Sequence, residues 1–276
     1  RLAQQLRNDP LTDAGIRTAI GEMYLRLEDE TEARRVFGEI VEFAPEDAFA
    51  RRRLGDLYRA YGWHEDAYRQ YLTLAALTPD DPTVSLLLAQ AAAGAGRIDE
   101  ALRLEQGGIA ASDPSGTAGL GRVALLWSSV RYAELKQAAR EANDAEKLAA
   151  LDQRLRRSGV LREASGLRAT LVWSHPDAGV ALWASHPRLP MTRPQDLAPE
   201  LGLESFDVPE PEDGTYRLEV RRRGEFRTAV DAKLVLVWRE GTPEEQVRIV
   251  TLRFEPGKDR LHAFTIVGDA LTEVTP

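Results

Sequence analysis

The sequence predicts an α+β multidomain protein, in which an α-solenoid of helical hairpins is followed by an antiparallel β-sandwich. Three observations lead to this fold class. Small and aromatic residues recur at a spacing of 34 residues, as from Gly21 to Gly55. Near Gly159 the apolar period changes from that of helices, 3.6, to that of strands, 2. The length of 276 residues suits about two domains of ordinary size.

Composition excludes several classes of protein. The 36 Lys and Arg against 44 Asp and Glu give a net charge of −8, which argues against a general nucleic-acid-binding protein. No apolar run is long enough to predict a direct membrane span. The chain has no cysteine, so disulfides, thiolate metal sites and thiol nucleophiles are all excluded, and both oxidising and reducing compartments stay open.

The repeated positions have the chemistry of two packed helices. Small residues allow the helices to approach closely, and prolines end the second helix. The positions are Ile20-Gly21, Tyr24, Ala33, Phe37 and Pro45, which recur as Leu54-Gly55, Tyr58, Ala67, Tyr71 and Pro79. This pattern resembles the tetratricopeptide repeat (TPR), although Arg17 and Arg51 stand where that repeat often has Trp. We expect Ala33 and Ala67 to form the small surface that faces the two glycines.

The resemblance predicts TPR repeats over residues 1–114. Repeats at 14–47 and 48–81 are clear, and a repeat at 82–114 is degenerate, because Glu105 replaces the aromatic residue and Gly108 is expected to interrupt the second helix. A partial repeat before residue 12 is suggested by Ala3, Leu6 and Pro10. We therefore expect the chain to be a fragment of a larger bacterial protein.

Residues 115–159 are predicted to be capping helices that cover the last repeat and are polar on their far side. Two apolar stripes of helical period support this prediction; they contain Leu120, Val123, Trp127 and Val130, then Leu148, Leu151 and Leu155. Asn143 or Asp144 is expected to cap the second of these helices, and Gly159 to end it.

Residues 160–276 are predicted to form the β-sandwich. Alternating apolar residues predict strands at 167–173, 216–220 and 247–251, and a shorter strand at 264–267. The continuous apolar run 234–238 indicates a strand covered on both faces. Residues 186–213 contain six prolines and little alternation, so we expect a long loop or an irregular edge there.

Roughly residues 165–255 of this second domain, through the segments LVWSHPDAGVALWASHP and DGTYRLEV, resemble a bacterial envelope-associated domain of unknown function (DUF2135-like). The framework positions that match are Trp173, Val180, Leu182, Trp183 and Pro187. The family's acidic positions do not match, since they are Ser174, Gly179, Ala181 and His186 here. We expect no calcium site, because Asp177 is the single acid of that turn and calcium needs several oxygen ligands. Asp207, Glu210 or Asp213 could compensate.

No known catalytic signature occurs in the sequence, so the chain is predicted not to be an enzyme and to have no catalytic residue, cofactor or metal. His175, His186, His262 and Asp177 could in principle form a zinc site, but we expect the two Ser-His-Pro histidines to be exposed turn residues. His64 is expected in the turn between two helices.

The TPR resemblance implies a concave groove lined by the first helix of each repeat. By spacing, the lining residues are Thr18, Glu22, Leu25 and Arg26, then Phe49, Arg52, Arg53, Asp56 and Arg59, then Thr83, Leu86, Leu87 and Gln90. Chaperone-binding TPR proteins have a Lys and an Asn where Thr18 and Glu22 stand, so that function does not carry over. Arg52, Arg53 and Arg59 could pair with acidic side chains of a partner, or alternatively with acids of neighbouring repeats.

The predicted function is a non-catalytic protein–protein interaction scaffold that binds a protein or peptide partner, with no nucleic acid. In the alternative, the β-sandwich binds a carbohydrate, an anion or a metal, through Trp183 or Trp238 as an aromatic platform or through the cluster Arg221, Arg222, Arg223 and Arg227 at an expected hairpin tip. The resemblance favours a periplasmic or cell-envelope location, and a cytoplasmic one stays open, as does the oligomeric state.

Overall fold

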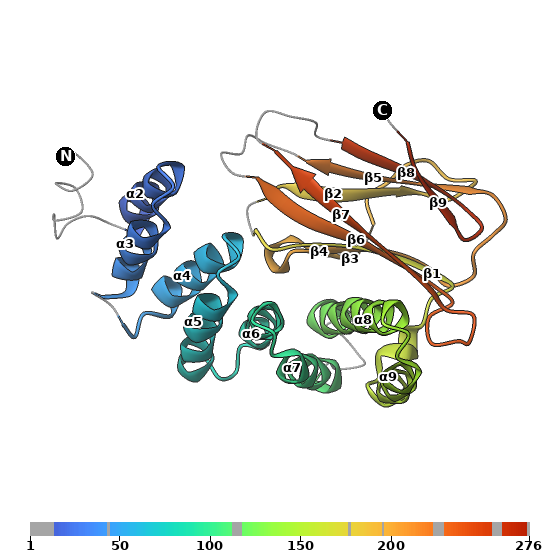
Figure 1. The fold of residues 1–276 in the computed structure, drawn as a ribbon, viewed down its shortest axis with the longest axis horizontal. Helices are drawn as coiled ribbons and strands as arrows, with labels where there is room; N and C mark the ends of the chain where they lie inside the picture. Colours follow the sequence, from blue (N-terminus) through green and yellow to red (C-terminus); the bar gives the residue numbers. More distant parts are fainter. Residues whose placement is uncertain are drawn as a thin grey trace. The chain divides into compact units, whose positions relative to one another are not determined.

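The computed structural model describes residues 14–42, 45–111, 118–175, 178–194, 196–222, 229–255 and 261–274. Within these ranges it has eight α-helices followed by nine strands. Figure 1 shows the ribbon coloured along the chain, with the helices before the strands. The chain divides into two compact units, Arg1–Ile98 and Asp99–Pro276. No helix of the described ranges is long and apolar enough to cross a membrane.

The first unit consists of helical hairpins. Its helices are α2 (Ala14–Arg26), α3 (Glu30–Glu42), α4 (Ala48–Ala60), α5 (His64–Leu77) and α6 (Pro82–Gly94). Asp47 and Asp81 are the N-caps of α4 and α6, and their carboxylates accept backbone N–H bonds from Phe49 and Thr83, each at 2.9 Å. The helices α3 and α5 end before Pro45 and Pro79, as the repeat predicts.

The repeat glycines lie where the two helices of a hairpin cross. A Cβ atom on Gly21 would lie 2.2 Å from the ring of Phe37, and one on Gly55 would lie 2.6 Å from the ring of Tyr71. The prediction that the alanines face these glycines is therefore wrong in its detail, because the aromatic residue of the second helix occupies that place. The absence of a side chain leaves room for the ring.

Three helices begin the second unit: α7 (Ile98–Ala111), α8 (Ala118–Glu141) and α9 (Ala145–Arg157). Asp144 caps α9 by accepting the backbone N–H of Lys147 at 2.9 Å, and Gly159 follows with φ of +83°, so both predicted ends are confirmed. Gly108 does not interrupt α7, contrary to our expectation. A glycine inside a helix costs only about 1 kcal/mol, which packing can offset.

Two antiparallel sheets form the sandwich. One has the strand order β3-β4-β1-β6-β7 and the other β2-β5-β8-β9. Their bounds are β1 (Leu167–Trp173), β2 (Val180–Ser185), β3 (Asp196–Ala198), β4 (Leu203–Val208), β5 (Thr215–Arg222), β6 (Val230–Trp238), β7 (Gln246–Phe254), β8 (Leu261–Val267) and β9 (Ala270–Val274). The predicted strands and the fold class are confirmed.

The segment 186–213 differs from the expected loop. It contains β3 and β4, and β4 pairs with β1 from Leu167↔Val208 to Val172↔Leu203. This prediction was wrong in part. The polar residues Glu204, Ser205 and Asp207 hide the strand in the sequence; they are bound within the fold, to Arg193 and the backbone N–H of Leu182, to Thr170, and to Arg168 respectively.

The five-stranded sheet is covered on both faces. On one face, residues such as Leu167 and Leu236 belong to the core between the sheets. On the other face, Arg168 and Thr170 are also buried, and α8 contacts β3, β4, β6 and β7. The run 234–238 is buried throughout, as predicted.

Polar contacts attach α8 to this outer face. Arg122, Ser129 and Lys136 are seven residues apart, nearly two helical turns, so they share one side of α8. Lys136 Nζ lies 2.7 Å from Glu245 Oε2, and Arg122 Nη2 lies 2.5 Å from Asp207 Oδ2. We predicted that the capping helices are polar on the side away from the repeats. The polar side of α8 that carries Arg122, Ser129 and Lys136 is bound to the sheet.

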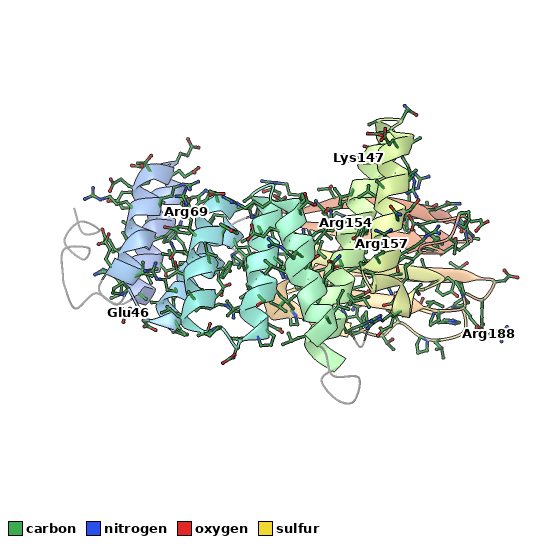
Figure 2. The ribbon with its side chains drawn as sticks, turned by 90° about the horizontal axis from the view of Figure 1, so that it is seen from below. Glu46, Arg69, Lys147, Arg154, Arg157 and Arg188 are labelled. Atoms are coloured by element: carbon green, nitrogen blue, oxygen red, sulfur yellow. The ribbon has the colours of Figure 1, made fainter. Side chains whose placement is uncertain are left out.

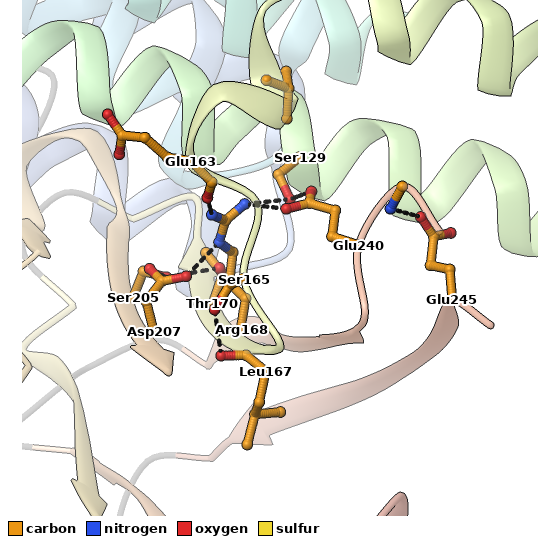
Figure 3. Close-up of polar contacts among 12 residues, drawn as sticks. Ser129, Glu163, Ser165, Leu167, Arg168, Thr170, Ser205, Asp207, Glu240 and Glu245 are labelled. Atoms are coloured by element: carbon orange, nitrogen blue, oxygen red, sulfur yellow. Dashed lines mark hydrogen bonds and ion pairs between the residues drawn. The ribbon is translucent and has the colours of Figure 1, made fainter. Parts of the chain in front are cut away.

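Arg168 is the centre of these contacts (Figure 3). Its side chain is 1% exposed, and its guanidinium donates to Glu240 Oε2 at 2.5 Å, to Asp207 Oδ1 at 2.6 Å and to Ser129 Oγ at 3.2 Å. The Ser129 hydroxyl in turn donates to Glu240. A buried charge is tolerated only when it is paired and hydrogen-bonded in this way.

Candidate functional site

The candidate site is the first-helix face, which we define by the predicted lining residues of α2, α4 and α6. Contacts within the first unit join these three helices. Arg53 Nη2 of α4 donates to Thr18 Oγ1 of α2 at 3.3 Å. Arg59 Nη1, also on α4, donates to Gln90 Oε1 of α6 at 2.5 Å. The spacing therefore brings residues of three successive helices into one row.

Asp56 lies in the middle of this row. Its carboxylate accepts from Arg52 Nε at 3.0 Å and from the Tyr71 hydroxyl at 2.6 Å, and Arg59 Nη2 is 3.7 Å away. A single acid thus holds two arginines of its own helix and the aromatic residue of the repeat. These contacts fix the direction of Arg52 before any partner is bound.

The lining residues differ in depth. Arg59 is 2% exposed and its partners lie within the fold, which favours the alternative that it stabilises the repeats. Arg52 and Arg53 are half-buried, so part of each residue reaches solvent. Phe49, at the start of α4, is 71% exposed.

The remaining lining residues also vary. Glu22 lies 3.9 Å from Arg26 on the same helix, and both reach solvent. Leu86 and Leu87 are buried. The exposed portion of the first-helix face is therefore carried by α2 and α4.

His64 is a residue whose role the sequence did not indicate. It is the first residue of α5, and its ring lies 2.3 Å from where a Cβ of Gly94 would be, so it packs directly on α6. Its Nδ1 is buried and accepts or donates no hydrogen bond among the described residues. Burial, and then the charge of Arg59, lower the pKa of His64 below its ordinary value. The one feature of the sequence that could have indicated this packing is Gly94, which leaves room for the ring of His64.

In the sandwich, the aromatic platform of the alternative function is reduced to one residue. Trp238 is 3% exposed, lies in the core and donates from Nε1 to the carbonyl of Gly268 at 3.2 Å. Trp183 is half-buried, and the guanidinium of Arg221 lies 4.5 Å above its ring. A sugar would have to displace Arg221 to stack on Trp183.

The arginine cluster does not form the expected hairpin tip, because β5 and β6 lie in different sheets. Arg222 is buried and donates to the carbonyl oxygens of Phe254 and Glu255 at 3.3 and 3.1 Å. Arg223 and Arg227 lie outside the described residues. Arg222 thus stabilises the fold and is not presented to an anion.

The predicted metal-ligating residues have other surroundings. His186 meets the ring of Tyr216 edge-on at 5.2 Å, and His262 meets Phe254 at 5.1 Å. Asp177 lies outside the described residues, so the calcium prediction stays untested. Among the residues that the structure describes, no three His, Asp or Glu form a group that could hold a metal.

A cavity of about 600 Å³ lies beside His186, at one end of the sandwich. Its lining includes Arg188, Asp213 and Arg217. Arg188 is 3.4 Å from Glu212, and both side chains are largely exposed. The ion pair of Arg188 is therefore solvated.

Of the comparisons with known proteins, the one with solved structures found matches. No protein-family model matches the chain, and no curated protein matches it either. Among solved structures, MamA from Desulfovibrio magneticus RS-1 (residues 41 to the end) is 14% identical, with 59% of this chain and 86% of that chain covered and a TM-score of 0.33. MamA from AMB-1 is 16% identical, covering 59% and 81%, with a TM-score of 0.33. PilF of Pseudomonas aeruginosa is 14% identical, covering 56% and 66%, with a TM-score of 0.28.

All three TM-scores are low, so these matches carry no argument about the fold of this chain. The assignment of the first unit as a TPR-like array therefore rests on its own hairpins, on the Gly21 and Gly55 crossings and on the spacing of the repeats.

Proposed function

We propose that the chain is a non-catalytic interaction scaffold, and that the first-helix face binds a protein or peptide segment bearing carboxylates. The observation that supports this most directly is the pair Arg52 and Arg53. Both residues are half-buried, and their guanidiniums are held by Asp56 and Thr18.

Preorganisation is the physical reason that such arginines suit recognition. A free arginine loses side-chain entropy when it binds, whereas one already held by a neighbour loses less. A guanidinium can donate two parallel hydrogen bonds to one carboxylate, so it fixes the orientation of the carboxylate as well as attracting its charge. The exposed ring of Phe49 adds an apolar contact on the same helix.

The resemblance of the sandwich to an envelope-associated domain supports a place in the bacterial cell envelope, with the helical hairpins available to a partner there. Ligand binding by the sandwich remains the second candidate, on Trp183 alone. The first-helix face is preferred because its exposed portion, on α2 and α4, has two arginines already held by Asp56 and Thr18.

A peptide array tests the proposal. The full chain is applied to an array of peptides of varied charge, together with two double variants of equal charge. One is Arg52→Gln with Arg53→Gln on the first-helix face, and the other is Arg35→Gln with Arg69→Gln on the second helices α3 and α5, where Figure 2 shows Arg69. The control arginines are 68% and 66% exposed.

We expect acidic peptides to bind the parent chain and the α3/α5 variant, and to lose most of their signal on the first-helix variant. Equal losses on both variants would show that net charge alone attracts the peptides. Binding that survives the loss of Arg52 and Arg53 would remove the face from consideration. Melting temperatures of both variants establish that they are folded.

A further inference from the structure

One side of α2 exposes an apolar stripe. Its members are Ile16, Met23 and Leu27, which are 39%, 46% and 73% exposed. At about 100° per residue, they lie within about 40° of one another around the helix axis. Leu25, a residue of the first-helix face, points to the opposite side of α2 on the same count, so the stripe is a separate surface. We call it the α2 stripe.

The same positions are covered in the next repeat. Thirty-four residues after Ile16 stands Ala50, which is buried. Thirty-four residues after Leu27 stands Tyr61, whose ring stacks on that of Phe37 of α3, with 5.7 Å between the centroids. The second helix of one hairpin therefore covers the stripe of the hairpin that follows. Among the described residues, no preceding hairpin does this for α2.

The position two residues after the stripe also contacts the preceding second helix. In one repeat, the guanidinium of Arg34 on α3 lies 4.0 Å above the ring of Trp63. In the next repeat, the guanidinium of Arg97 lies 4.3 Å above the ring of Tyr68 on α5. Asp29 stands at this position beside α2. A cation of a helix that covered α2 would therefore meet a carboxylate where Arg34 meets an aromatic ring.

Glu28 has a backbone conformation that the other repeats give to glycine. Its φ is +59°, and the residues that follow it at the 34-residue spacing are Gly62 and Gly96, with φ of +74° and +79°. A side chain is disfavoured in this left-handed conformation. The carboxylate of Glu28 makes no hydrogen bond or ion pair among the described residues. The fold itself thus gives no reason for a charged residue at this place.

The acids at this end of the hairpin leave a negative charge beside the α2 stripe. Other acids of the region are paired with arginines of the same hairpin, as Glu22 with Arg26, Glu30 with Arg34, and Glu32 with Arg35. Glu28 and Asp29 have no cation within ion-pair distance in the described part of the chain. They remain as two uncompensated carboxylates next to Leu27.

We propose that the α2 stripe binds an amphipathic, basic helix of a partner protein, packed on α2 as α3 is packed on α4. This helix presents a large apolar side chain to Leu27 and, three residues earlier, a Lys or Arg to Asp29, which is the spacing of Phe37 and Arg34. A second copy of the chain fits less well, because its α3 is already packed on its own α4.

The probe is a fluorescein-labelled peptide with the sequence of α3, residues 30–42, in which the four glutamates are replaced by glutamine. Its binding to the full chain is followed by anisotropy. The stripe variant is Met23→Gln with Leu27→Gln. The matched control is Leu72→Gln with Leu77→Gln, two leucines of α5 that are 48% and 39% exposed. A basic peptide does not suit the arginines of the first-helix face, so this test is independent of the proposed function.

We expect the Kd of the peptide to rise about ten-fold or more in the stripe variant, because two large apolar side chains no longer contribute buried surface. The control should stay within about two-fold of the parent chain on the same grounds. Equal weakening in both variants, or no weakening in either, overturns the proposal.

Glu28→Gly separates binding from folding. Glycine relieves the left-handed backbone, so the melting temperature should rise. The Kd of the peptide should nevertheless increase about three-fold at low salt, and less at high salt, because one carboxylate is lost. A rise in stability with an unchanged Kd would show that the acids do not select a basic helix, and would overturn that assignment.

Two other occupants of the α2 stripe give different results. If the first residues of the chain itself occupy it, Leu2→Gln with Leu6→Gln in the full chain should make the peptide bind more tightly. If a second copy occupies it, sedimentation velocity should show a dimer that the stripe variant dissociates. Either result overturns the proposal.

Discussion

Two glycines of the first unit have opposite surroundings although both lie inside helices. A Cβ on Gly55 would lie between 2.6 and 3.0 Å from three atoms of the Tyr71 ring, which its hydroxyl fixes to Asp56. A Cβ on Gly38 would meet nothing nearer than the Tyr58 hydroxyl at 3.8 Å. Gly55 lies 34 residues after Gly21 and is a repeated position of the hairpins, whereas Gly38 is not.

We predict that Gly55→Ala lowers the free energy of unfolding by about 1–3 kcal/mol, because the ring must move. Gly38→Ala should raise it by about 0.5–1 kcal/mol, because alanine restricts the unfolded chain and favours helix. Urea denaturation of both variants measures the difference. If both variants gained stability, α4 and α5 would be far enough apart at Gly55 for the Tyr71 ring to accommodate a methyl group.

His64 predicts a pH dependence. Its pKa in the folded chain is lowered by burial and by Arg59, so between that value and its unfolded pKa, about 6.5, the unfolded state binds more protons. The stability that follows from keeping the ring neutral is present above about pH 6.5 and is lost as the pH falls below it.

Replacing His64 by Phe keeps a ring against Gly94 and removes the titrating group. We expect the parent chain to lose unfolding free energy between pH 7 and pH 5 more steeply than His64→Phe, as followed by urea denaturation at each pH. Parallel curves for the two chains would contradict a lowered pKa.

The site residues show what spacing predicts and what it leaves open. The 34-residue period placed Thr18, Arg53, Arg59 and Gln90 on successive first helices, and the contacts between them are present. Spacing does not give depth, however. Arg59 is buried by partners from other helices that no local pattern indicates, while Arg52, two turns earlier, keeps part of its surface.

At the scale of elements, alternation predicted β1 although its polar residues Arg168 and Thr170 are buried, and it missed β4, whose polar residues Glu204 and Ser205 are also buried. In β4, the carboxylate of Glu204 is fully buried, pairs with Arg193 and accepts the backbone N–H of Leu182 at 2.6 Å. It thereby satisfies a donor at the edge of β2, where an unpaired N–H would invite another strand. A charged residue that binds a backbone group of another sheet carries no signal in a linear pattern.

The attachment of α8 to the sheet depends on Arg168. We predict that Arg168→Met lowers the free energy of unfolding by about 3–5 kcal/mol, because it leaves the buried carboxylate of Glu240 without a cation and leaves Asp207 with Arg122 alone. Burial already raises the pKa of Glu240, with Arg168 the main opposing influence.

The matched control is Arg253→Met, which removes an ion pair with Asp231 whose two side chains are 58% and 61% exposed. We expect it to change stability far less than Arg168→Met does, because the pair is exposed to solvent. Chemical denaturation of the two variants compares the same substitution in the two settings. Similar losses would mean that the Arg168 contacts are solvated and that α8 is held by its apolar residues.

At the scale of the whole molecule, residue patterns and compactness divide the chain at different places. The change of period at Gly159 separates helices from strands, which is what a periodicity measures. It does not tell which elements pack together. Buried contacts join α7 to α8, through Arg131 and Glu105 at 2.6 Å, and α8 to the sheet, so the compact unit begins at Asp99.

This difference predicts which pieces of the chain fold. In residues 99–276, α8 covers Arg168, and Val235 and Val237 share that face of the sheet by their register with Thr170 and Arg168. In residues 160–276 the same face is left open, with apolar side chains exposed and two buried carboxylates deprived of Ser129 and Arg122. We therefore expect residues 99–276 to be monodisperse with a cooperative thermal transition, and residues 160–276 to aggregate or to bind the dye ANS strongly. Size-exclusion chromatography and calorimetry of the two pieces measure this. Equal melting temperatures would mean that the sandwich is complete without α7, α8 and α9, and that those helices belong with the repeats, as the residue pattern divides them.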